Sequence, residues 1–150
     1  MIGESLLQSF NVKIRVIYAD TDAMGVVYHT NYIKWLEIGR TEFLRKNDII
    51  YAQLEERGYY FPVTEVYCNY LLPARYDQLI AVETSLEFMR RASMKFNYII
   101  RDTEKEKILV EGYTVHACVN TKGKIVRIPL DIIEKVNDNR NIEDQKEGGK

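Results

Sequence analysis

The order of hydrophobic and polar residues predicts that the chain begins with a β-strand followed by a loop. Between residues 10 and 18, apolar side chains occupy every second position, which is the period of a strand with one buried face. They are Phe10, Val12, Ile14, Val16 and Tyr18. Residues 19–25 are mostly short or polar and end at Gly25, which is typical of a turn. Two carboxylates, Asp20 and Asp22, therefore lie on a loop.

A long helix is predicted over residues 31–46. This stretch contains no proline, and Thr30 or Asn31 is available as its N-cap. Its apolar residues cover more than one side of a helical wheel, which indicates a helix buried on most of its surface. They are Tyr32, Ile33, Trp35, Leu36, Ile38, Phe43 and Leu44. A shorter helix over residues 51–57 is expected to end at Gly58.

A period of two returns after Gly58 and predicts four more strands. The apolar faces of the first three are Thr64, Val66, Cys68, Tyr70 and Leu72, then Ile80, Val82, Leu86 and Phe88, then Met94, Phe96, Tyr98 and Ile100. The last strand covers residues 108–120. The connections at 73–77, 90–92 and 102–107 are short, which favours antiparallel pairing.

Five strands and one long helix predict an α+β architecture. Each strand has one apolar face, so the sheet needs one cover, and the helix over residues 31–46 is the only long apolar element available. A curved antiparallel sheet wrapped around a central helix satisfies both, and this arrangement is the hot-dog fold. Such a unit leaves sheet edges to protect, so we expect a homo-oligomer, either a symmetric dimer or a tetramer.

Length and composition indicate a single domain. The chain has 150 residues, of which 46% are hydrophobic and 29% charged, as in globular proteins. We assign the folded domain to residues 1–136, with residues 129–136 forming a short terminal helix or an extension. Ile142 is the only large apolar residue in 137–150, so we expect this segment to be a flexible polar tail.

Charge and cysteine usage restrict the partners and the compartment. The net charge of −1 argues against a general nucleic-acid or anionic-membrane binder, although a local basic patch is compatible with it. Cys68 and Cys118 lie in apolar stretches without metal-binding spacing, which predicts reduced, buried thiols in the cytoplasm. Residues 1–10 lack the features of a signal peptide, and no stretch approaches the roughly 20 apolar residues of a membrane span. Two distant histidines give a metal site little support.

The stretch from Tyr18 to Arg40 contains groups that suit chemistry at a carbonyl carbon. Asp22 and His29 lie just before the predicted start of the long helix. Unpaired amides at a helix N-terminus carry a partial positive charge and can stabilise an oxyanion. A carboxylate placed opposite them could attack the carbonyl carbon or activate a water molecule.

This stretch resembles the signature of the 4-hydroxybenzoyl-CoA thioesterase-like and YbgC-like acyl-CoA thioesterases of the hot-dog superfamily. The match runs through residues 20–22, 25–29, 31–32 and 37–40, and the strand spacing fits from about 10 to 120. The resemblance implies hydrolysis of an acyl-CoA thioester to a free acid and coenzyme A, without a metal or redox cofactor. It implies that Asp22 is the catalytic carboxylate and that the His29 amide begins the oxyanion site. The role of Asp22 as nucleophile or general base, and any help from the His29 side chain, stay open.

Candidate substrate contacts lie in two further places. Arg90, Arg91 and Ser93 belong to a basic cluster at a predicted hairpin, and guanidinium groups suit phosphates. The resemblance implies that this region contacts coenzyme A, with a solvated turn as the alternative. The aromatic residues Tyr28, Tyr32, Tyr59, Tyr60 and Phe61 could line an acyl pocket, or they could be core and dimer contacts.

Several polar residues have a structural interpretation instead. Glu37 is the rival carboxylate, because other hot-dog branches use a glutamate from the central helix. Its spacing to Arg40 and Thr41 nevertheless favours a surface or interface pair. Asp20 is better explained as a loop or cap residue, and His116 by packing or an interface.

Two other functions are compatible with a hot-dog fold. Hydratases and dehydratases of this fold join an Asp to a His about five residues on through an Asn-Pro turn. Asp22 and His29 lie seven apart with no proline between them, so hydration is disfavoured. The third possibility is an acyl-CoA binding protein without turnover, against which the presence of Asp22 argues. The acyl group itself is not specified by the motif.

Overall fold

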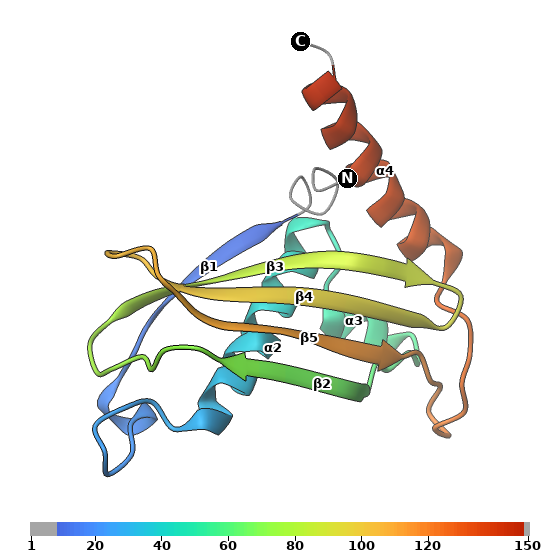
Figure 1. Cartoon of the computed structure of the whole chain (residues 1–150). Helices are drawn as coiled ribbons and strands as arrows, with labels where there is room; N and C mark the ends of the chain where they lie inside the picture. Colours follow the sequence, from blue (N-terminus) through green and yellow to red (C-terminus); the bar gives the residue numbers. More distant parts are fainter. Residues whose placement is uncertain (1–8, 149–150) are drawn as a thin grey trace.

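The computed structural model describes residues 9–148, which form one antiparallel sheet with helices on its faces (Figure 1). The strands are β1 (Phe10–Arg15), β2 (Val63–Tyr70), β3 (Leu79–Arg90), β4 (Ser93–Asp102) and β5 (Ile108–Ala117). The helices are η1 (Tyr18–Asp20), α2 (His29–Lys46), α3 (Tyr51–Glu56) and α4 (Leu130–Gly148). The strand order is β1-β3-β4-β5-β2, with every pair antiparallel. This confirms the predicted α+β, hot-dog architecture.

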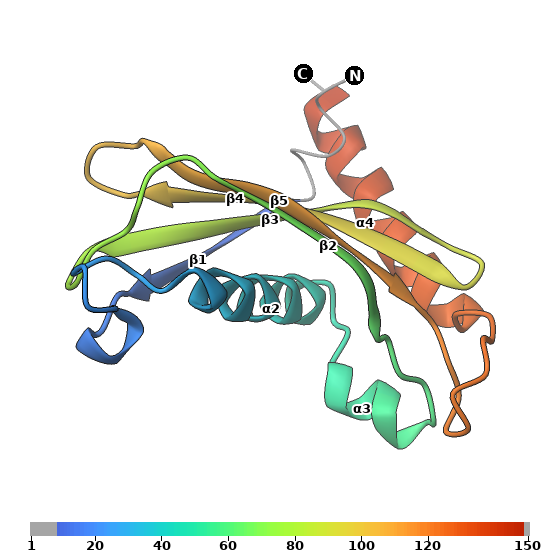
Figure 2. The ribbon, with the colours of Figure 1, turned by 60° about the horizontal axis from the view of Figure 1, so that its bottom comes forward.

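Helix α2 lies across one face of the curved sheet, as Figure 2 shows. One side of the helix is buried against the core residues of β3 and β4. The prediction that α2 is buried on most sides is wrong in the single chain, because Ile33 and Ile38 are 39% and 37% exposed. The sheet covers only the side of the helix that carries Tyr32, Trp35, Leu36, Gly39, Phe43 and Leu44.

Gly39 allows the helix to approach the sheet closely. A Cβ atom at this position would lie 2.5 Å from Oγ1 of Thr84 and 2.8 Å from Cγ1 of Val82, both on β3. Both distances are shorter than a non-bonded contact allows, so a larger residue would force α2 away from the sheet. The glycine therefore sets the packing distance at the centre of the core.

Four predicted strands differ from the structure in detail. The first strand ends at Arg15, and Tyr18 is 77% exposed in η1 instead of continuing the buried face. On β3, an irregularity between Leu86 and Phe88 shifts the alternation, so Met89 is buried where Phe88 was expected. Both faces of the edge strand β2 remain largely exposed, with only Cys68 half-buried. Strand β5 ends at Ala117, three residues earlier than predicted.

The C-terminal helix is longer than the predicted element at 129–136. Helix α4 continues to Gly148, and the absence of proline and glycine from residues 130–147 explains why a polar segment continues a helix. Its first turns are anchored to the body, since Ile132 and Val136 are buried and Arg57 forms two hydrogen bonds with Asp131. The prediction about a signal peptide concerns residues 1–10, of which 1–8 lie outside the described residues. The last two residues of the predicted tail, 149–150, also lie outside them.

Candidate active site

The predicted catalytic carboxylate lies in a tight turn. The Met24 amide donates a hydrogen bond to Oδ1 of Asp22 (2.8 Å). The Asp22 amide donates to the Val26 carbonyl, and the Gly25 amide donates to the Asp22 carbonyl. Gly25 adopts φ +80°, a left-handed conformation that glycine accepts without strain. Among the described residues, no group donates a hydrogen bond to Oδ2 of Asp22. The turn therefore orients the half-buried carboxylate and leaves one oxygen unoccupied.

Asp20 connects this turn to the start of α2. Its side chain is buried and accepts the Ile17 amide at 3.0 Å, while its carbonyl accepts bonds from the Tyr28 amide and the Asn31 side chain. Lys34 lies 3.6 Å from the Asp20 carboxylate. These contacts confirm the interpretation of Asp20 as a loop residue with a structural role.

Helix α2 begins two residues earlier than predicted. Its N-cap is Tyr28, with extended backbone and no side-chain cap, so the assignment of Thr30 or Asn31 as N-cap is wrong. The Asn31 side chain binds the Asp20 carbonyl instead. In the described part of the chain, the backbone amides of His29 and Thr30 have no hydrogen-bond partner, as expected for the first turn of a helix. These two amides form a donor pair with a partial positive charge.

An apolar hollow of about 220 Å³ lies beside this helix terminus. It is lined by Val27, His29, Tyr32, Tyr70, Leu71, Leu72 and Pro73. The Tyr70 hydroxyl donates to the His29 carbonyl at 3.2 Å, and the Tyr32 and Tyr70 ring centroids are 5.4 Å apart. Two tyrosines from different elements thus form a wall next to His29.

The electrostatics of the two tyrosines reflect this environment. Burial raises the pKa of Tyr32, and the nearby Asp22 carboxylate raises it further, against the opposing effect of the Ala74 amide that donates to its hydroxyl. Burial, together with Cys68, raises the pKa of Tyr70 to about 12. Both phenols therefore stay neutral at physiological pH.

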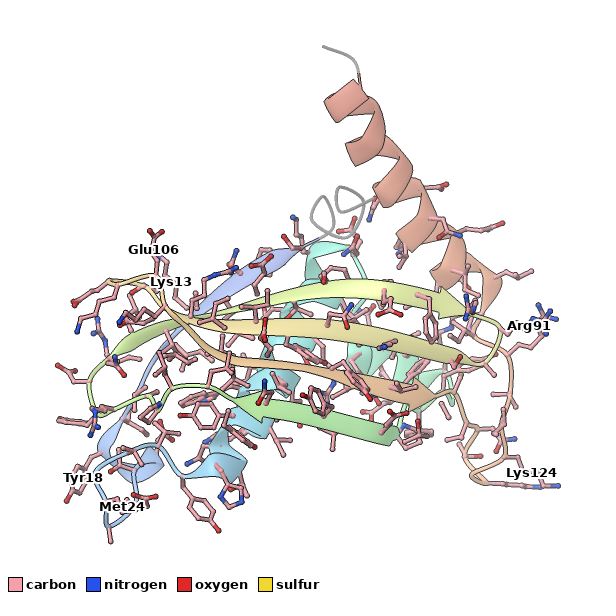
Figure 3. The ribbon with its side chains drawn as sticks, viewed as in Figure 1. Lys13, Tyr18, Met24, Arg91, Glu106 and Lys124 are labelled. Atoms are coloured by element: carbon pink, nitrogen blue, oxygen red, sulfur yellow. The ribbon has the colours of Figure 1, made fainter. Side chains whose placement is uncertain are left out.

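The other predicted substrate contacts divide into a group near Asp22 and a group far from it. Tyr28 is 47% exposed, and its ring lies 4.6 Å from that of His29, so it belongs to the same corner as Asp22. Arg91 lies in the β3–β4 turn at the opposite end of the sheet from Met24 (Figure 3). Strand β3 separates these ends by about 36 Å at roughly 3.3 Å per residue. Within one chain, Arg90, Arg91 and Ser93 are therefore not brought together with Asp22.

The basic turn is well defined by its own contacts. The Arg90 guanidinium lies 4.3 Å from the centre of the Phe88 ring, and the Arg91 carbonyl accepts the Ile128 amide at 2.7 Å. Arg91 has φ +53°, and its side chain is exposed. Ser93 begins β4 and pairs with Ala117. This turn presents two guanidinium groups to solvent at one end of the sheet.

Glu37 and Arg40 do not form the predicted ion pair in the described chain. Both residues instead line a second hollow of about 370 Å³ between α2 and α3. His116 is buried with its ring against Phe96, which confirms a packing role. Sequence reasoning missed the contribution of Tyr70 to the wall beside His29. The alternation of apolar residues around Tyr70 predicted that this residue lies on a strand face. It did not predict which end of α2 that face contacts.

Cysteines and potential metal ligands add no further candidate site. Cys118 is buried and Cys68 half-buried, and both thiols are free. Burial raises the pKa of Cys118 to about 11, so this thiol stays protonated. No three histidine, cysteine or carboxylate side chains gather as a possible metal site in the part of the chain that the structure describes. Among these same described residues, no helix is long and apolar enough to cross a membrane.

Comparison with known proteins is consistent with this geometry. The model of the Thioesterase-like superfamily matches residues 16–136. The chain is 36% identical over 127 residues to the acyl-CoA thioesterase YbgC of Haemophilus influenzae, covering 82% of this chain and 90% of the relative. The acyl-CoA thioester hydrolase YbgC of Escherichia coli is 34% identical over 125 residues, covering 83% and 92%.

A solved structure extends the similarity over most of the chain. The DHNA-CoA thioesterase from Staphylococcus aureus superimposes with a TM-score of 0.83 at 29% identity, covering 95% of both chains. The similarity includes the helix start and the loop that carries Asp22, since the family match begins at residue 16. The chain therefore belongs to the thioesterase-like superfamily.

Proposed function

We propose that the protein hydrolyses acyl-CoA thioesters to a free carboxylic acid and coenzyme A. The observation that carries this proposal is the juxtaposition of three features: the Asp22 carboxylate, the free amides of His29 and Thr30, and an apolar hollow beside them. Family membership and the names of the relatives support the same reaction. The hollow suits the acyl group, and the amides suit the thioester oxygen.

The reaction requires one carboxylate and one donor pair. The thioester oxygen accepts bonds from the His29 and Thr30 amides, which stabilise the negative charge that develops as the carbonyl carbon becomes tetrahedral. In one route, Asp22 removes a proton from a water molecule as this water attacks the carbon, the carbon–sulfur bond breaks, and Asp22 passes the proton to the CoA thiolate. In the other, Asp22 attacks the carbon, the carbon–sulfur bond breaks to leave a mixed anhydride on Asp22, and a water molecule then hydrolyses this anhydride, regenerating the Asp22 carboxylate and supplying the proton for the thiolate. We assign the exposed His29 side chain a helping role, as a hydrogen-bond partner of the attacking water.

In a dimer, the basic turn of a second copy would lie closer to the candidate active site than the chain's own basic turn does. The edge strand β2 exposes Val63, Val66 and Tyr67, and α2 exposes Ile33 and Ile38 beside it. An exposed edge with apolar side chains favours pairing, and a two-fold axis would place β2 antiparallel to its copy.

This pairing shortens the distance that coenzyme A must span. The start of β2 lies at the same end of the sheet as the β3–β4 turn, because Val63 pairs with His116 and Ser93 with Ala117. In the antiparallel pair, this end of the partner lies beside the Asp22 end of the first chain. The partner's Arg91 is then about 15 Å, or three strand spacings, from the Tyr70 end of β2, which carries one wall of the hollow. The proposed substrate therefore occupies a site made by two chains.

A thiol-release assay tests the reaction. Short-chain, long-chain and aromatic acyl-CoAs, and acyl carrier protein thioesters, are supplied in parallel, and free thiol is measured continuously. Release of thiol from at least one member supports the proposal. Binding without release would indicate a non-catalytic acyl-CoA binding protein, and loss of an enoyl-CoA double bond without thiol release would indicate a hydratase. The free thiols of Cys68 and Cys118 suit the reducing cytoplasm in which we propose the protein acts.

A further inference from the structure

The second hollow lies on the same side of α2 as the candidate active site. It is lined by Glu37, Arg40, Thr41, Tyr51, Ala52, Glu55 and Phe61. His29, Ile33, Glu37 and Arg40 follow one another at helical spacing and form a partly exposed stripe along α2. Eleven residues separate His29 from Arg40, which corresponds to about 16 Å along the helix. A chain of about a dozen carbons attached at the first site would span this distance.

A buried chain of hydrogen bonds lies next to Arg40 beneath this hollow. The nearby Arg40 guanidinium lowers the pKa of Tyr98, whose hydroxyl lies 2.6 Å from Oγ1 of Thr114. Oγ1 of Thr114 is 2.9 Å from Nε2 of His116, and Nδ1 of His116 is 3.1 Å from the Phe61 carbonyl. A carbonyl only accepts, so Nδ1 carries the proton and Nε2 accepts from Thr114. This fixes the direction of each hydrogen bond from Tyr98 through Thr114 and His116 to Phe61, a chain called the relay below.

The relay places buried polar groups where apolar side chains would ordinarily lie. Tyr98, Thr114 and His116 are each at most 2% exposed. Such a network is tolerated only when each group is satisfied, and the network then makes its members rigid. Phe61, at one end of the network, and Arg40, beside the other end, both line the hollow. The hollow therefore has a rigid, polar floor next to the guanidinium.

The remaining lining residues supply further hydrogen-bonding groups. The Tyr51 hydroxyl accepts the Phe61 amide at 3.0 Å, so its proton is available to donate into the hollow. Glu37 and Glu55 form no ion pair within the described residues and both act on Tyr51, as their effect on its pKa indicates. The hollow thus offers two donors, Arg40 and Tyr51, and two carboxylate acceptors.

We propose that this hollow binds a neutral hydroxyl-type group at the far end of a medium-length acyl chain whose thioester lies at Asp22. A hydroxyl accepts from Arg40 or Tyr51 and donates to a carboxylate. A plain alkyl end would leave these groups desolvated and unpaired, and an ω-carboxylate would meet the two glutamates. The inference rests on the proposed thioester hydrolysis and specifies its substrate class.

Matched substrates test the proposal directly. The ratio of kcat/KM for 12-hydroxydodecanoyl-CoA to that for dodecanoyl-CoA is expected to be at least ~10 in the natural protein, because a site built for a hydroxyl rejects the analogue that lacks it. Arg40→Gln and Glu55→Gln should bring this ratio toward one. Arg45→Gln and Glu56→Gln change neighbouring exposed residues outside the hollow and should preserve it. A ratio near one in the natural protein would overturn the proposal.

Binding of the free acids separates this proposal from the reaction itself. Calorimetric titration with 12-hydroxydodecanoate and dodecanoate should show tighter binding of the hydroxy acid, and Tyr51→Phe should reduce the difference. If no thioester is hydrolysed but the hydroxy acid binds preferentially, the proposed function fails and the hollow's assignment stands. Equal binding of the two acids would overturn the assignment. Because Arg40→Gln disturbs the buried relay, Glu55→Gln on the exposed rim gives the same test without that disturbance.

Discussion

Acid should destabilise the protein through His116. Burial, against the opposing effect of the Phe61 carbonyl and with a smaller contribution from the nearby Arg40, lowers the pKa of His116 from 6.5 to about 4. Between these two pH values the unfolded chain binds a proton at this position that the folded chain does not bind. The free energy of unfolding therefore falls as the pH decreases from 6.5 to 4.

The size of this effect follows from the same two values. At about 1.4 kcal/mol per pH unit, the full loss is about 3 kcal/mol, and most of it has occurred by pH 4.5. The cause is specific, because Nε2 of His116 accepts a bond from Thr114, and protonation of Nε2 removes that acceptor within the core.

Urea unfolding at pH 7.5 and 4.5 measures this contribution. The natural protein should lose about 2–3 kcal/mol more than His116→Gln over this interval, because the variant has no imidazole to protonate. Each protein is compared with itself, so any constant cost of the substitution cancels. Protein concentration is held fixed because assembly contributes to stability. Equal losses in the two proteins would refute the reasoning.

Three other predictions concern packing, coenzyme binding and assembly. Gly39→Ala should lower the free energy of unfolding by about 1–3 kcal/mol, as measured by thermal unfolding. Adding Thr84→Ala should restore part of the lost stability, because it removes the nearest clashing atom. Arg91→Ala should raise KM for an acyl-CoA with kcat nearly unchanged, but should not affect a pantetheine thioester; equal losses on both would indicate a structural turn. Val66→Lys on the β2 edge should reduce the mass seen by light scattering toward the 17.6 kDa of one chain and should reduce turnover. The natural protein should show a multiple of that mass, with a tetramer near ~70 kDa expected. A fully active natural monomer would contradict this expectation.

The fold could be predicted because its local patterns agree with its global arrangement. The alternation in Met94, Phe96, Tyr98 and Ile100 corresponds to a buried face of β4, and the long apolar stretch at 31–46 corresponds to most of α2. The errors arise where a tertiary contact or an irregularity overrides the local pattern. The β3 irregularity moved burial from Phe88 to Met89, and Asn31 binds the Asp20 carbonyl instead of capping the helix.

The candidate site could be predicted only in part. The motif located Asp22 and His29 because they lie close together in the sequence, and their loop brings both to one corner. The contribution of Tyr70 and the relay beside Arg40 depend on strand order and on how α2 lies over the sheet, which no short spacing encodes. For the same reason, the sequence predicted Arg91 as a coenzyme A contact but not its position at the opposite end of the chain's own sheet from the Asp22 turn.

The steady-state rate of Asp22→Asn on an acyl-CoA that the natural protein hydrolyses tests the central claim most directly. The substitution keeps the shape of the side chain and its ability to accept the Met24 amide, but removes the carboxylate charge. We expect kcat to fall at least ~10²-fold, the lower range for loss of a catalytic base, with the melting temperature little changed. On an acyl-CoA without a distal hydroxyl, Asp20→Asn and Glu37→Gln should each retain activity within roughly tenfold, because neither carboxylate is assigned to the thioester carbon. Normal turnover by Asp22→Asn, with or without loss of activity in Glu37→Gln, would contradict the account.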